Sequence, residues 1–179
     1  MYITTTRFDE KTLNEHKSWC LNNNFNGAII NSPTPMSPKI PHNALVCVIH
    51  MLNLNRKQHN GCSGNIVGIS FIKNQPVYDH NENYGYIFDN FKIYNDGNYN
   101  RYTYLSPYHI KIDPMGESKI NRNIISELEE VLFYGKGHMK RGHGITLLNS
   151  KNLSDSTQRY FNSLNETILN RIKLKCNEL

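Results

Sequence analysis

The stretch Leu45-Val46-Cys47-Val48-Ile49-His50-Met51-Leu52 is apolar at every position but one. A short apolar run that is rich in β-branched residues predicts a buried strand. Residues 66–72 form a second run of this kind and predict its partner strand, while the polar residues 53–63 between the two runs predict a hairpin loop. Gly68 lies within the second run, where a glycine indicates a bulge, a bend or a close approach by a ligand.

A helix and two short strands are predicted before this pair. Residues 2–6 (YITTT) and 28–30 (AII) are short and rich in β-branched side chains, which favours strands. Residues 9–22 between them predict a helix that begins at Asp9 as its N-cap and turns Trp19 inward.

The second half of the chain is predicted to contain four further strands and two helices. Aromatic and polar residues alternate over 88–94 and 100–105, and Asn95-Asp96-Gly97 between these segments predicts a hairpin. The remaining elements are a strand over 108–112, a helix over 122–134, a strand over 145–148 and a helix over 155–176 that begins after Ser154.

Together these elements predict an α+β protein built around a small, curved, antiparallel β-barrel, with an N-terminal helix and C-terminal helices. A chain of 179 residues without an internal linker is expected to form a single domain. Residues 1–115 would supply the strand-rich core, and residues 116–179 would add a helix, a glycine-rich basic loop, a strand and the C-terminal helix.

The composition favours an anionic partner. The formal net charge of +5 suits nucleic acid or another anionic surface. No apolar run is long enough to span a bilayer, so no membrane partner is expected. The four cysteines show no C-x-x-C spacing, which argues against a zinc knuckle or a redox motif and favours a reducing, cytoplasmic location. The chain contains no complete catalytic motif, and no cofactor is expected.

The most basic segment is 135–144, with the sequence GKGHMKRGHG. It holds four glycines, three cations and two histidines, and no carboxylate lies between Glu130 and Asp155. Glycines let the backbone approach a ligand closely, and cations with free N–H groups favour phosphate. The segment therefore predicts contacts to a nucleic-acid backbone from Lys136, His138, Lys140, Arg141 and His143.

Other interpretations of this segment stay open. His138 and His143 could act as acid and base in a small nuclease or nucleotide-processing enzyme. A metal would need further ligands from distant segments, such as His109 or Asp113, and no metal site is predicted. The segment could also pack against another subunit of a structural or virion-associated protein, or its charges could simply be solvated.

Arg101 lies among Tyr99, Tyr102 and Tyr104. A cation between aromatic residues suits a single strand, because bases stack on the rings while the cation meets phosphate. In this interpretation Arg101 and Tyr102 belong to the nucleic-acid-binding surface. In the alternative, the tyrosines are half-buried sheet residues with polar tips.

From residue 2 to residue 72, the order of segments resembles the PUA-like superfamily, especially its YTH and EVE domains. The counterparts are a first strand over 2–6, a helix over 9–17, Trp19, and strands over 27–31, 45–49 and 66–69, the last with the pattern x-V-G-I. The resemblance implies a barrel fold and binding of RNA or single-stranded DNA without catalysis.

Several domains of this superfamily read a modified base in an aromatic pocket. By the same resemblance, Trp19 would line such a pocket, and Thr5, Thr6 and Asn31 would lie near the edge of the base. Because the chain has one tryptophan where YTH pockets use two or three, tyrosines would complete the aromatic wall. Residues 98–104 and 135–146 are also similar to segments of uncharacterised proteins of giant DNA viruses, which implies a viral source and an infected host cell as the location.

Overall fold

A computed structural model describes residues 1–53, 64–77, 91–112, 120–134 and 144–176, with side chains described up to residue 171. Its largest element is a five-stranded sheet with the order β6-β4-β3-β1-β7. The strands are β1 (Tyr2–Phe8), β3 (Leu45–Asn53), β4 (Gly64–Lys73), β6 (Tyr108–Lys111) and β7 (Thr146–Leu147).

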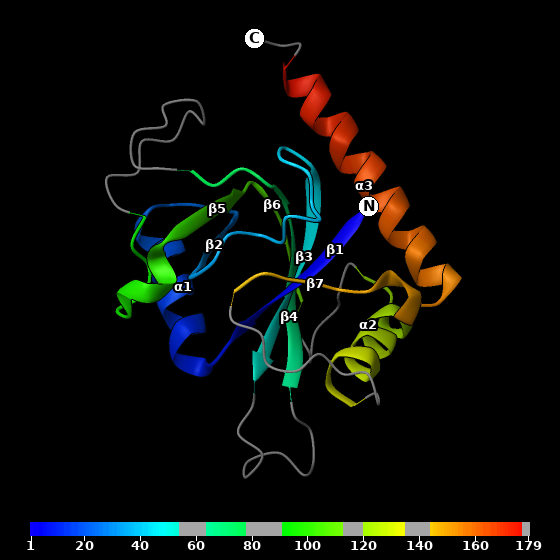
Figure 1. Ribbon diagram of the computed structural model, residues 1–179, viewed down its shortest axis with the longest axis horizontal. Coiled ribbons are helices and arrows are strands. Elements are labelled where there is room, and N and C mark those ends of the chain that lie inside the picture. The colour runs from blue at the N-terminus through cyan, green and yellow to red at the C-terminus, as the bar shows by residue number, and fades with distance from the viewer. Residues whose placement is uncertain (54–63, 78–90, 113–119, 135–143, 177–179) are drawn as a thin grey trace.

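A second sheet has two strands, β2 (Ala28–Ser32) and β5 (Tyr102–Ser106), which pair antiparallel. This small sheet and helix α1 (Glu10–Asn22) lie on one side of the large sheet, whereas α2 (Arg122–Glu129) and α3 (Asp155–Cys176) lie on the other (Figure 1). A π-helical turn, η3 (Glu130–Tyr134), continues α2. The molecule is therefore layered, with the five-stranded sheet in the middle.

Both faces of the central strand β3 are buried, because successive side chains point to opposite faces of a sheet. Cys47 and Ile49 join the core under α2 and α3, together with Leu128 of α2 and Phe161 of α3. On the opposite face, the alternate β3 residues Val46 and Val48 pack against Ile30 and Tyr104 of the small sheet.

The predicted antiparallel β-barrel is wrong. β1 pairs with β3 in parallel, from Tyr2 opposite Val46 to Phe8 opposite Leu52, so the large sheet is mixed. Within the described residues, β6 and β7 form the two edges of this sheet, and β2 and β5 pair only with each other as a separate sheet. The barrel prediction failed because it assumed that neighbouring strands were joined by hairpins, whereas α1 and β2 lie between β1 and β3 in the chain.

The predicted hairpin around Asn95-Asp96-Gly97 is also absent from the described residues. Residues 91–94 form no strand, and β5 pairs with β2. The Asp96 side chain instead accepts a hydrogen bond from Asn98 N at 3.0 Å and begins a short 3-10 helix, η2 (Gly97–Asn100). An aspartate that satisfies a backbone donor two residues ahead favours this local turn over a strand ladder.

Most other predicted elements are confirmed. Strands form around 2–6, 28–30, 45–52, 66–72 and 108–112, and helices form around 9–22, 122–134 and 155–176. Asp9 caps α1 by accepting from Thr12 N at 2.7 Å, while Thr12 Oγ1 accepts from Asp9 N at 3.0 Å. The bulge that Gly68 predicted is present, because the β3–β4 register shifts immediately beside the pair of His50 and Gly68. None of the helices in the described ranges combines the length and the apolar character needed to cross a membrane.

Glu127 joins α2 to the start of α3. Its carboxylate accepts from Ser154 N at 2.5 Å, from Ser154 Oγ at 2.7 Å and from Thr157 Oγ1 at 2.7 Å. Ser154 also caps α3, as predicted, by accepting from Thr157 N at 3.3 Å. One half-buried carboxylate therefore holds the first turn of the last helix against the preceding one.

Replacing Glu127 by alanine is expected to lower the free energy of unfolding by about 1–2 kcal/mol, because three donors lose a charged acceptor. Urea denaturation followed by circular dichroism measures this difference. Glu130→Ala removes an exposed carboxylate one turn further along and serves as the control, with an expected change within about 0.5 kcal/mol. Equal stabilities of the two variants would contradict the role of Glu127.

Candidate functional site

A small pocket lies where β1 ends and α1 begins. We call it the Asn31 pocket, and its volume is about 230 Å³. It is lined by residues from β1, α1, β2, β3, the 94–99 segment and the start of the 144–150 segment: Thr6, Arg7, Phe8, Asp9, Thr12, Asn31, Asn53, Tyr94, Tyr99 and Gly144. Segments far apart in the sequence thus meet at one hollow whose walls are partly polar and partly apolar.

Asn100 fixes the wall of the pocket that carries Tyr94. Its Oδ1 accepts from Ile93 N at 3.1 Å, from Tyr94 N at 3.1 Å and from Asn31 Nδ2 at 2.8 Å, and its Nδ2 donates to Tyr94 O at 2.6 Å. A side-chain amide here makes the backbone hydrogen bonds that a neighbouring strand would otherwise make. Asn100 therefore ties the 93–94 segment to β2.

The same contacts determine the orientation of Asn31. Its Nδ2 donates to Phe91 O at 2.7 Å and to Asn100 Oδ1 at 2.8 Å, and both partners can only accept. The amide oxygen Oδ1 must therefore point away from them. This oxygen is buried and has no hydrogen-bond partner in the described chain, although the residue is only 4 % exposed.

A buried carbonyl oxygen without a donor costs about 1–3 kcal/mol. Such a group usually indicates strain, a missing water or a ligand that supplies the donor. Asn31 lines the pocket, and a ligand N–H group that reached Oδ1 would supply the missing donor. Among the described residues that line this pocket, Asn31 is thus the one with a buried side-chain acceptor that has no hydrogen-bond partner.

The pocket also offers aromatic surface and a carboxylate. Tyr94 and Tyr99 meet edge to face, with ring centroids 6.1 Å apart and an interplanar angle of 79°. Burial, followed by the nearby acidic groups, raises the pKa of Tyr94, so its phenol stays neutral at physiological pH. The backbone hydrogen bond from Thr12 lowers the pKa of Asp9, which therefore stays ionised at the rim.

Gly144 forms part of the rim. No residue type with a side chain fits at this position without strain. Its φ of +81° is in the left-handed region, and a Cβ there would lie 2.2 Å from Ser32 Oγ. The chain thus passes very close to β2 at the point where the basic segment ends in the sequence. The predicted contact residues of that segment, Lys136, His138, Lys140, Arg141 and His143, lie outside the described residues.

The structure places some of the other predicted site residues at the Asn31 pocket and some of them elsewhere. Thr6 and Asn31 both line the pocket. Thr5 is buried at the opposite face of β1, beside Ile49 and Thr146 in the sheet. Arg101 is exposed after η2 and Tyr102 is half-buried in β5, and neither lines the pocket.

Trp19 is a core residue. It is 9 % exposed and packs with Phe8, Phe25 and Ile29, its ring meeting that of Phe25 edge to face at 6.1 Å. It does not line the Asn31 pocket. The aromatic residues that do so are Phe8, Tyr94 and Tyr99, which the resemblance had not singled out.

A cluster of three histidines, which sequence reasoning did not find, lies between α1 and the large sheet. His16 of α1 packs beside His50 of β3 at a centroid distance of 6.3 Å, and His50 lies 5.1 Å from His109 of β6. Ser70 Oγ makes hydrogen bonds of 2.8 Å to both His50 Nε2 and His109 Nδ1. The His109 ring lies over Gly68, where a Cβ would come within 2.5 Å of its Cε1.

The surroundings of these three histidines favour the neutral form of each imidazole ring. Burial, followed by the charges of neighbouring groups, lowers the pKa of His16 to about 4. Burial and then Lys111 lower the pKa of His109 to about 4, and burial lowers that of His50 well below its usual value. In the described part of the chain, no three His, Cys, Asp or Glu side chains are placed to hold a metal ion. None of the three histidines lines the Asn31 pocket.

Comparison with known proteins adds no relative: the chain matches no protein-family model, and neither a curated protein nor a solved structure is significantly similar to it. Its function must therefore be argued from the pocket itself. The relevant features are the volume, the unpaired oxygen of Asn31, the tyrosine pair and the ionised Asp9.

Proposed function

We propose that this protein binds single-stranded nucleic acid, RNA or DNA, by holding one unstacked base in the Asn31 pocket, and that it does so without catalysis. The observation that carries the proposal is the Oδ1 atom of Asn31, a buried acceptor that finds no donor among the described residues, on a residue that lines the pocket. A base amino or imino N–H would supply the missing donor.

The size and chemistry of the pocket support a base over a larger ligand. Its volume of about 230 Å³ is below the range of about 300–1,000 Å³ that is usual for drug-sized ligands. Tyr94 and Tyr99 offer ring surface, and Asp9 offers a second acceptor for an exocyclic amino group. Adenine, cytosine and guanine carry such a group, as does adenine with a single modified amino group.

The positive charge of the chain supports a polymeric anion as the ligand. The net charge is +5, and the basic segment 135–143 leads directly into Gly144 at the rim of the pocket. Cations that neutralise phosphates make binding weaken as salt increases, with a slope of about −0.7 per phosphate for single strands. We therefore expect binding that depends on salt as well as on the pocket.

Asn31→Ala is expected to weaken binding of a single-stranded oligonucleotide of about ten nucleotides by about tenfold, the equivalent of one lost hydrogen bond. Fluorescence anisotropy with labelled RNA and DNA pools, at two salt concentrations, measures the change. Because Asn31 also supports the fold, Asn53→Trp provides an independent variant. It fills the pocket from an exposed position at the end of β3.

Asn98→Ala is the control, because Asn98 is exposed on η2 and does not line the pocket. Oligonucleotides with and without a modified adenine amino group test which base is preferred, and gel analysis of the recovered strands tests for cleavage. Absence of salt-sensitive binding to either pool, or undiminished binding by both Asn31→Ala and Asn53→Trp, would overturn the proposal. The variant Lys140→Glu/Arg141→Glu tests the part assigned to the basic segment.

A further inference from the structure

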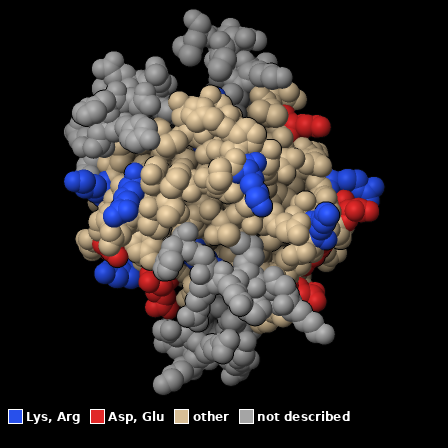
Figure 2. All heavy atoms as spheres, in the orientation of Figure 1, with Lys and Arg blue, Asp and Glu red and all other residues tan. Residues whose placement is uncertain are grey.

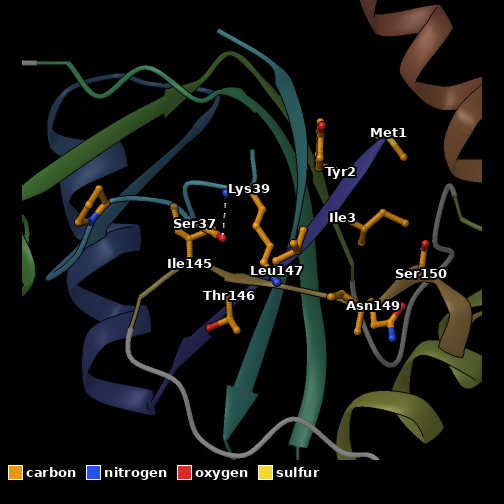
Figure 3. Close-up of a pocket in the computed structure, with 12 residues that line it drawn as sticks. Met1, Tyr2, Ile3, Ser37, Lys39, Ile145, Thr146, Leu147, Asn149 and Ser150 are labelled. Carbon is orange, nitrogen blue, oxygen red and sulfur yellow. Dashed lines mark hydrogen bonds between the residues drawn. The ribbon is translucent and has the colours of Figure 1, made fainter. Parts of the chain in front are cut away.

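A second, larger hollow surrounds the edge strand β7 (Figure 3). We call it the β7 groove, and its volume is about 760 Å³. Its walls come from the start of β1, from the loop that carries Ser37 and Lys39, and from the segment Ile145 to Ser150. Figure 3 shows the Lys39 side chain extending from its loop across the hollow in the direction of Leu147.

The residues that line the β7 groove favour an anion with an apolar part. Those in the described ranges include one lysine and no carboxylate side chain, together with the hydroxyl or amide groups of Ser37, Thr146, Asn149 and Ser150. Tyr2, Ile145 and Leu147 supply apolar surface beside these groups. On the face seen in Figure 2, acidic and basic side chains lie toward the margins, and one basic side chain stands near the centre.

The β7 groove and the Asn31 pocket are adjacent along two pieces of chain. β1 contributes Tyr2 and Ile3 to the groove and Thr6 to the pocket. Three residues of a strand span about 10 Å, so the two hollows are close neighbours. The segment that begins at Gly144 repeats this arrangement, since Gly144 lines the pocket and Ile145 already lines the groove.

We propose that the β7 groove binds the nucleotide next to the base in the Asn31 pocket, with its phosphate at Lys39 and its sugar and base against Tyr2 and Leu147. This inference rests on the proposed function and specifies it further, because it makes a strand, and not a free base or nucleoside, the ligand. Lys39 is exposed, so its ammonium group can meet a phosphate without distorting the fold.

The experiment compares three probes on one protein: adenosine, the dinucleotide ApA and an adenine-rich strand of about ten nucleotides. Adenosine occupies only the pocket, whereas the two longer probes also reach the groove. Lys39→Glu is expected to leave adenosine binding unchanged, to weaken binding of the strand by about tenfold, and to reduce the salt slope of strand binding by about 0.7. Calorimetric titration at three salt concentrations measures all three quantities.

Lys17→Glu is the matched control, because it makes the same change of charge at an exposed position of α1 that lines neither hollow. An equal effect of Lys17→Glu and Lys39→Glu would show only a general charge effect and would overturn the inference. Unchanged strand binding in Lys39→Glu, with binding still lost in Asn31→Ala, would overturn the groove assignment and leave the proposed function standing. Binding that is insensitive to Asn31→Ala and Asn53→Trp would remove the proposed function and this inference together.

Discussion

Gly27→Ala is expected to lower the free energy of unfolding by about 3 kcal/mol. A Cβ at Gly27 would lie 1.9 Å from the backbone oxygen of Ser106 and 2.7 Å from Phe25 Cζ. Ser106 cannot move away easily, because its Oγ donates to Phe71 O at 2.8 Å and accepts from Phe71 N at 3.2 Å. The added methyl group would therefore separate β2 from β5 or the small sheet from β4.

Urea denaturation measured by tryptophan fluorescence provides the test, since Trp19 is buried near this region with Phe25 and Ile29. Gly97→Ala is the control, because a Cβ at Gly97 would meet no atom within 4 Å. We expect Gly97→Ala to change stability by less than about 0.5 kcal/mol. A stability of Gly27→Ala equal to that of Gly97→Ala would mean that β2 and β5 are not packed as described.

Acid is expected to destabilise the fold between about pH 6.5 and pH 4 through the three-histidine cluster. In the folded state the pKa of His16 and of His109 is about 4, mainly because both rings are buried, whereas in the unfolded chain a histidine titrates near 6.5. The unfolded chain therefore binds more protons in this interval, so stability rises with pH there and is complete above the unfolded value. Each such histidine contributes a slope of up to about 1.4 kcal/mol per pH unit.

Unfolding free energies measured at several pH values from 7 to 4 test this expectation. His16→Phe keeps an aromatic ring beside Phe8 and should reduce the slope by about one proton, or about 1.4 kcal/mol per pH unit. His42→Gln replaces an exposed histidine outside the cluster and serves as the control. A slope that His16→Phe does not reduce would show that acid acts elsewhere in the molecule.

The sequence patterns predicted the positions of helices and strands better than they predicted which strands pair and in which direction. The runs at 45–52 and 66–72 became β3 and β4 because adjacent antiparallel strands need only local contacts. The parallel pairing of β1 with β3 depends on contacts across some forty residues, and the apolar pattern of either strand is the same for both directions. Continuous burial of β3 is typical of a strand covered on both faces and fits the layered structure better than a barrel.

Two of the residues singled out from the sequence lie at the Asn31 pocket, and the others do not. Thr6 and Asn31 line it, whereas Trp19 is buried in the core, because a large ring at the end of an amphipathic helix gains most by packing. Asn100 could not be found from the sequence, since its role depends on Asn31 and Tyr94 lying beside it in space. The three histidines are likewise spread over residues 16, 50 and 109, and no local spacing joins them.

Ser70 has one hydroxyl proton to share between two ring nitrogens. It can donate to His50 Nε2 or to His109 Nδ1, and the other nitrogen must then carry a proton and donate to Ser70 Oγ. The tautomers of the two rings are therefore coupled through Ser70, because its hydroxyl can donate to only one of the two nitrogens. When Ser70 donates to one ring, a change of that ring's tautomer that keeps both hydrogen bonds requires a rotation of the Ser70 hydroxyl and a matching change in the other ring, which links side chains on β3, β4 and β6.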